Sequence, residues 1–93
     1  MRKILAIAVL SVLAHPAFAQ QNIERDYGFD YPGGDYRDIR SITLDQCQYI
    51  CRRDGRCVAF SYVPSKRWCW LKDEMMSSVH DGRTISGFKP EPE

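Results

Sequence analysis

The 93-residue sequence has little histidine and no motif typical of enzymatic chemistry. It contains two histidines, and it lacks both the Cys-x-x-Cys pair of thiol redox proteins and a glycine-rich phosphate loop. A serine–histidine–aspartate site could combine only Ser77 or Ser78 with His80 and Asp81, on one polar loop where nothing would hold them in position. The sequence therefore predicts a protein that is not an enzyme and that uses no cofactor.

An excess of charge of either sign is also absent. There are 13 Lys and Arg residues against 12 Asp and Glu residues, a formal net charge of +1. The cations near the end of a predicted helix, Arg52, Arg53 and Arg56, are separated from Lys66 and Arg67 by roughly the 20 Å length of a strand. This balance provides no general attraction to nucleic acid or to an anionic membrane, so neither is an expected partner.

Long apolar runs are missing beyond the first residues. Arg2 and Lys3 precede an apolar run over 4–14, and small residues at Ala17 and Ala19 match a signal-peptidase site. The run is shorter than the roughly 20 residues of a membrane span, and the cleavage site argues against the alternative of an uncleaved anchor. We expect residues 1–19 to be a signal peptide, and the mature chain to be exported, periplasmic or extracellular, with no membrane span.

Four cysteines fall between residues 47 and 69: Cys47, Cys51, Cys57 and Cys69. In a short exported chain they favour two disulfides over zinc, because their spacings lack the paired knuckles of structural zinc sites. No metal site is expected. Pairing Cys47 with Cys51 across one helical turn would be strained, because their β-carbons would lie about 5–6 Å apart instead of roughly 4 Å. The reversal after the helix instead favours Cys51–Cys57 and Cys47–Cys69.

The predicted order of elements is strand, strand, helix and three more strands. A flexible N-terminus over 20–26 precedes an extended segment over 27–31 and a turn over 32–35. Thr43 and Gln46 predict a capping box at the helix start, and Gly55 predicts a left-handed cap at its end. Further elements are expected at 36–39, 57–63, 68–71 and 84–89, before a disordered tail over 90–93.

Strand alternation assigns the side chains of the central hairpin to two faces. If Cys57 and Cys69 face the helix, alternate residues on each strand must face it as well. These are Ala59 and Ser61 on the first strand and Leu71 on the second. Five large apolar side chains then share the opposite face: Val58, Phe60, Tyr62, Trp68 and Trp70. This face could be a ligand surface, or the tyrosine-rich segment over 27–36 or the loop over 75–79 could cover it.

The ordered pattern resembles the PAN/apple domain family in its small, single-domain bacterial form. The matching pieces are 30–36, Cys47 with Cys51, 57–62, 69–72 and 86–89. The resemblance implies an α+β domain over 27–89, in which a curved antiparallel sheet cradles one helix and two disulfides join them. A third bridge of apple domains has no cysteines here. The family implies non-catalytic binding of proteins or carbohydrates, and its ligand sites vary too much to transfer a residue.

The function predicted from the sequence is an exported binding module for a protein or carbohydrate ligand. The alternative is a small inhibitor or accessory factor of a partner envelope protein. The candidate ligand-binding residues are a cation pair and an indole pair on the central hairpin: Lys66, Arg67, Trp68 and Trp70.

Overall fold

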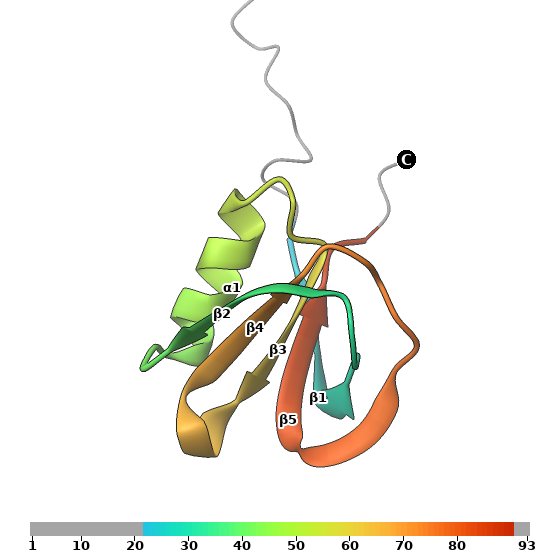
Figure 1. Ribbon diagram of the computed structural model, residues 1–93. Helices are drawn as coiled ribbons and strands as arrows, with labels where there is room; N and C mark the ends of the chain where they lie inside the picture. Colours follow the sequence, from blue (N-terminus) through green and yellow to red (C-terminus); the bar gives the residue numbers. More distant parts are fainter. Residues whose placement is uncertain (1–21, 91–93) are drawn as a thin grey trace, which may run out of the picture.

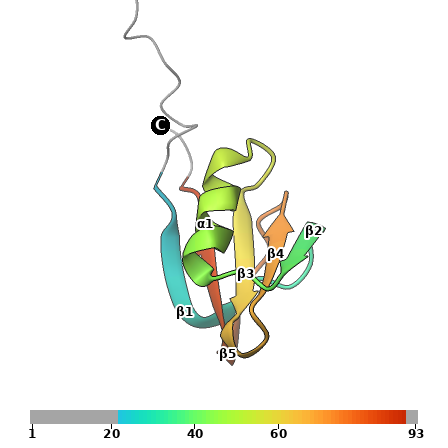
Figure 2. The same ribbon diagram turned by 90° about the vertical axis from the view of Figure 1, so that its left-hand side faces the viewer.

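A computed structural model describes residues 22–90, which form a five-stranded antiparallel sheet with one helix on one face (Figures 1 and 2). The elements in chain order are β1 (Glu24–Asp30), β2 (Asp35–Arg40), α1 (Leu44–Arg53), β3 (Ala59–Val63), a 3₁₀ turn (Pro64–Lys66), β4 (Trp68–Lys72) and β5 (Val79–Phe88). The strand order is β1-β5-β3-β4-β2. The architecture is the small α+β domain that the sequence predicts. The predicted signal peptide over 1–19 and residues 91–93 of the predicted tail lie outside the described residues.

The start of α1 follows from its sequence. The Thr43 hydroxyl accepts a hydrogen bond from the Gln46 N–H, and the Gln46 side chain accepts one from the Thr43 N–H, so the capping box is present. At the other end the prediction for Gly55 is wrong, because the three glycines with positive φ in residues 22–90 are elsewhere. Asp54 ends the helix in an extended conformation, and its N–H bonds to carbonyls of the last turn.

Two disulfides fasten α1 to the sheet. Cys47 is bonded to Cys69 on β4, and Cys51 is bonded to Cys57 in the turn before β3, with Cα–Cα distances of 5.6 Å and 5.2 Å. All four cysteines have an exposed fraction of 0%. This pairing is the one expected from the sequence, and it places the bridges in the centre of the core.

The predicted faces are correct for β4 and wrong for β3. Cys69 and Leu71 face the helix, but their cross-strand partners are Tyr62 and Phe60, which therefore share the core with them. Ser61 is opposite Trp70 on the far face. The error arises because Cys57 precedes the strand: its N–H bonds to Asp54 and the chain bends at Val58, so alternation begins only at Ala59.

Both outer segments are more ordered than the sequence suggested. Glu24 to Asp26 belong to β1 and pair with β5, although the sequence assigned them to a flexible N-terminus. β5 begins at Val79, five residues before the predicted start at Thr84, so His80 is a strand residue rather than a loop residue. Hydrogen bonds between β1 and β5 hold these residues in strands, and the local sequence alone does not predict this pairing.

Asp54 joins the helix end to β2. Its carboxylate accepts a 2.6 Å hydrogen bond from the Tyr36 hydroxyl and a 3.0 Å bond from the Arg56 N–H. The Tyr36 hydrogen bond, followed by the Arg56 N–H, lowers the pKa of Asp54. A carboxyl group whose pKa is lower in the folded state stabilises the fold above its unfolded pKa, about 3.9, and loses this contribution as the pH falls through the folded pKa.

We therefore expect Tyr36→Phe to lower the free energy of unfolding by about 1 kcal/mol at neutral pH. The deficit relative to the wild type should shrink as the pH falls below about 4, because protonated Asp54 no longer favours the hydroxyl. Urea unfolding of both proteins across this pH range measures the difference. An identical deficit at neutral and acidic pH would contradict the role assigned to Asp54.

Candidate functional site

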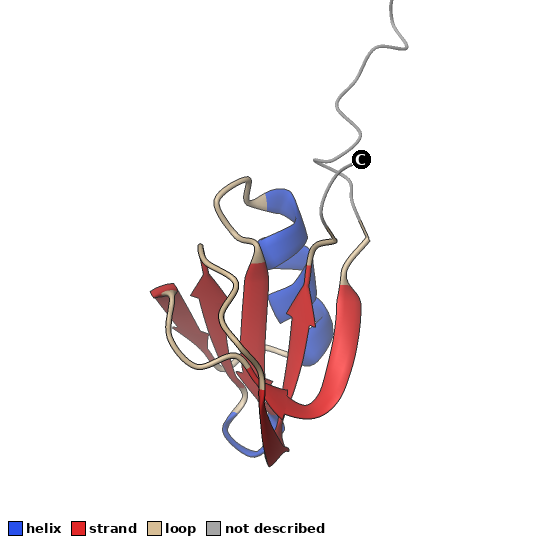
Figure 3. Cartoon of the chain, turned by 90° about the vertical axis from the view of Figure 1, so that its right-hand side faces the viewer, coloured by secondary structure: helices blue, strands red, loops and turns tan. Residues whose placement is uncertain are grey.

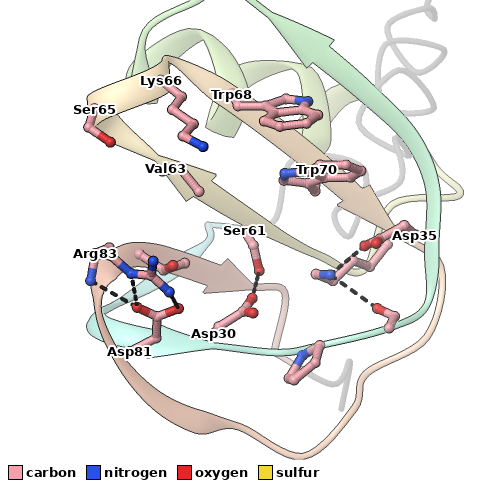
Figure 4. A pocket seen from close by; sticks show the side chains of 14 residues that line it. Asp30, Asp35, Ser61, Val63, Ser65, Lys66, Trp68, Trp70, Asp81 and Arg83 are labelled. Atoms are coloured by element: carbon pink, nitrogen blue, oxygen red, sulfur yellow. Dashed lines mark hydrogen bonds and ion pairs between the residues drawn. The ribbon is translucent and has the colours of Figure 1, made fainter.

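The sheet face opposite α1 carries a pocket of about 400 Å³ (Figure 4). It lies between β3, β4, the start of β5 and the connection from β1 to β2. Its lining residues are Asp30, Pro32, Gly33, Asp35, Ser61, Val63, Ser65, Lys66, Trp68, Trp70, Lys72, Asp81, Arg83 and Thr84. The pocket is within the size range of small-ligand sites and combines indole rings with hydroxyl, carboxylate and ammonium groups.

Two stacked indoles form one wall of this pocket. Trp68 and Trp70 project from the same face of β4, with ring centroids 4.4 Å apart and planes inclined by 34°. The Arg40 guanidinium lies 3.7 Å from the Trp68 ring centroid, and the Trp68 N–H donates a 2.9 Å hydrogen bond to Asp38. Neighbours on β2 thus fix Trp68. The Trp70 indole N–H has no hydrogen-bond partner among residues 22–90 and is directed toward the open middle in Figure 4.

The connection over residues 31–34, which we call the strap, crosses the face opposite α1 because β1 and β2 are the two edges of the sheet (Figure 3). Positive φ angles at Gly33 and Gly34 allow it to turn back, as the sequence predicted. Tyr31, which is buried, packs against Phe88 and covers the face at the end of β5. The strap therefore covers part of the face and leaves the half beside Trp70 open.

Lys72 holds the strap against the sheet. Its side chain is 2% exposed, and its ammonium group donates a 3.1 Å hydrogen bond to the Gly33 carbonyl and forms an ion pair with Asp35. A lysine buried this deeply is stable only with such partners. The strap wall of the pocket is thus positioned by a buried charge rather than by loop packing alone.

Two further polar contacts fix the floor and the rim. Asp30, at the end of β1, accepts a hydrogen bond from the Ser61 hydroxyl on β3. On the rim, the Arg83 guanidinium hydrogen bonds to Asp81 and holds the pKa of that carboxyl below its usual range. Asp81 is consequently paired with Arg83 and not with His80, whose ring instead packs edge-on against Phe29 at 5.4 Å.

The structure brings three of the four sequence candidates together. Lys66, Trp68 and Trp70 line the pocket, whereas Arg67 is not among its lining residues. Arg67 has φ of 51°, and its carbonyl accepts hydrogen bonds from the N–H groups of Ser41 and Ile42. The sequence analysis missed Ser61 because it assigned this residue to the wrong face of β3. It missed Asp30 and Lys72 because their partners in the pocket wall, Ser61 and Gly33, are distant in the sequence.

Residues 22–90 contain no cluster of three or more His, Cys, Asp or Glu side chains that could hold an ion. Within the same range no helix is long and apolar enough to cross a membrane.

Comparison with known proteins identifies related sequences. A model of the PAN domain family matches residues 29–72, from the end of β1 to the end of β4. A G-type lectin S-receptor-like serine/threonine-protein kinase of Oryza sativa subsp. japonica is 34% identical over 62 residues, which cover 67% of this chain and 8% of the kinase. An uncharacterized protein of Acanthamoeba polyphaga mimivirus is 28% identical over 67 residues, covering 66% of this chain and 20% of that protein. The chain thus spans a small part of each relative.

Proposed function

We propose that this protein is an exported, non-catalytic binding module and that its pocket recognises a carbohydrate. The observation that carries the proposal is the Trp70 ring beside unpaired polar groups in a pocket of about 400 Å³. The apolar face of a sugar ring packs on an indole, while hydroxyl groups exchange hydrogen bonds with serine, carboxylate and ammonium groups. The match to the PAN family and to a segment of a lectin-like receptor kinase supports this class of ligand.

Shape favours a sugar over a folded protein partner at this pocket. A stable protein interface buries about 800 Å² on each partner, usually on a broad surface. The pocket is instead concave and bounded by the strap, Trp70 and the hairpin turn, so it accepts one small group. A protein ligand remains the second candidate, as an inhibitor or accessory factor would require, and capture from an envelope extract alongside a glycan array separates the two.

We expect Trp70→Ala to abolish or weaken glycan binding by at least about tenfold, because the stacking surface is lost. Tyr49→Ala is the matched control: Tyr49 is an exposed aromatic residue on α1, away from the pocket. Binding to the array and near-ultraviolet circular dichroism should be measured for both variants. Loss of binding in the Tyr49 variant, with binding retained in the Trp70 variant, would move the site to the helix side.

A further inference from the structure

Four of the six charged groups around the pocket form ion pairs with one another, Asp35 with Lys72 and Asp81 with Arg83. Five of the six have partners within the domain: Asp30, Asp35, Lys72, Asp81 and Arg83. The sixth, Lys66, forms no ion pair or side-chain hydrogen bond with any residue that the structure describes. The pocket therefore presents one cation whose charge no neighbouring side chain balances.

Lys66 is placed to reach a ligand rather than only solvent. It ends the 3₁₀ turn after β3, and the left-handed conformation of Arg67 fixes how the chain leaves that turn. In Figure 4 its stem enters from the hairpin end and the ammonium group points into the open middle, on the same side as the Trp70 indole N–H. Two hydrogen-bond donors thus converge there without an acceptor from the described chain.

The opposite side of the pocket carries one carboxylate oxygen that lacks a partner among residues 22–90. One oxygen of Asp30 accepts the Ser61 hydroxyl, and the other has no partner among residues 22–90. Asp35 and Asp81 also line the pocket, and they are ion-paired with Lys72 and Arg83. A ligand with a second negative group at this end would lie close to the unpaired Asp30 oxygen, which costs free energy. The polarity favours one negative group at the Lys66 end and neutral hydroxyl groups at the Asp30 end.

We propose that the ligand is a saccharide unit with a single anionic group, a carboxylate or a sulfate, that pairs with Lys66. The sugar ring lies against Trp70, and its hydroxyl groups donate to Asp30. This inference rests on the proposed function, because it specifies which sugars the pocket accepts. It also requires that Lys66 act through its charge and not through the apolar stem of its side chain.

Matched sugars test the charge directly. Methyl glycosides of glucose, glucuronate and glucose 6-sulfate, and the three galactose counterparts, are titrated into ¹⁵N-labelled protein while the Trp70 indole resonance is followed. We expect the acidic sugars to bind at least about tenfold more tightly than the neutral ones, the size expected of one charge-assisted hydrogen bond. Their affinity should also fall with added salt. The carboxylate and sulfate arms identify which anionic group is preferred.

Variants at the hairpin separate Lys66 from general charge. Lys66→Met keeps an apolar stem and should reduce the affinity for acidic sugars to that for neutral sugars, whereas Lys66→Arg should retain the preference. Arg67→Gly removes a neighbouring cation outside the pocket and suits the positive φ, so it should change affinity less than twofold.

Each result bears on a different statement. Equal binding of neutral and acidic sugars, or an unchanged preference in Lys66→Met, overturns the anionic ligand and leaves carbohydrate recognition standing. Binding of no sugar on the array or in the titrations, with an unperturbed Trp70 resonance, overturns both. A shift confined to acidic sugars that is equally lost in Arg67→Gly overturns the assignment to Lys66 and indicates non-specific attraction.

Discussion

Replacing Cys47 and Cys69 together by alanine is expected to lower the free energy of unfolding by about 3 kcal/mol. The bridge closes a loop with a sequence separation of 22, which restricts the unfolded chain, and both sulfur atoms lie in the core. A small domain has a total stability of only about 5 kcal/mol, so most of it would be lost. Urea unfolding followed by tryptophan fluorescence measures the change.

The second bridge supplies the control for this experiment. Cys51 and Cys57 are separated by only six positions and are equally buried, so their replacement by alanine should cost about 2 kcal/mol. The order of the two losses is the test of the loop-length explanation. If the short bridge proved the more costly to remove, strain or packing at α1 would have to dominate instead.

Gly87→Ala is expected to destabilise the domain by about 3 kcal/mol, the upper end of the usual cost of overpacking. A β-carbon at Gly87 would lie 2.7 Å from Cζ of Phe60 and 2.8 Å from Cγ2 of Ile23, and closer still to another carbon of the Phe60 ring. Phe60 is fully buried, so its ring cannot move away without opening the core. Thermal unfolding monitored by circular dichroism reports the loss.

Gly82→Ala on the same strand is the matched variant. A β-carbon there meets no atom within 4 Å, so the change should be neutral or slightly stabilising. A comparable loss in both variants would mean that glycine is needed in β5 for its backbone and not for the space that it leaves to Phe60.

The sequence predicts the local and covalent parts of this fold well. The capping box at Thr43 depends on residues three positions apart, and the disulfide pairing follows from the chain reversal after α1, so both can be derived from neighbouring residues. The sheet and helix implied by the family resemblance are also observed. The cysteine spacing and the hairpin pattern on which the resemblance rests determine how α1 lies against β4.

The pocket depends on contacts between distant residues and is harder to predict. Asp30 and Ser61 are 31 positions apart, and Lys72 and Gly33 are 39 apart, so no local sequence pattern predicts either contact. The face error at Phe60 shows a second cause, because one bend at Val58 reverses the alternation of the next strand. Trp68 and Trp70 could be placed because their strand keeps its alternation from Cys69.

The pairing of β1 with β5 also determines how the domain would respond to tension. Glu24, at the start of β1, is paired with Phe88, at the end of β5, so residues 22 and 90 lie at the same end of this strand pair (Figure 1). Neither of the two disulfides links β1 to β5. A force that separates residues 22 and 90 would break the hydrogen bonds between β1 and β5 one after another, starting at Glu24, instead of loading them all together. β1 would peel away first and carry Asp30 and the strap out of the pocket, while the bridges still held α1 to β4.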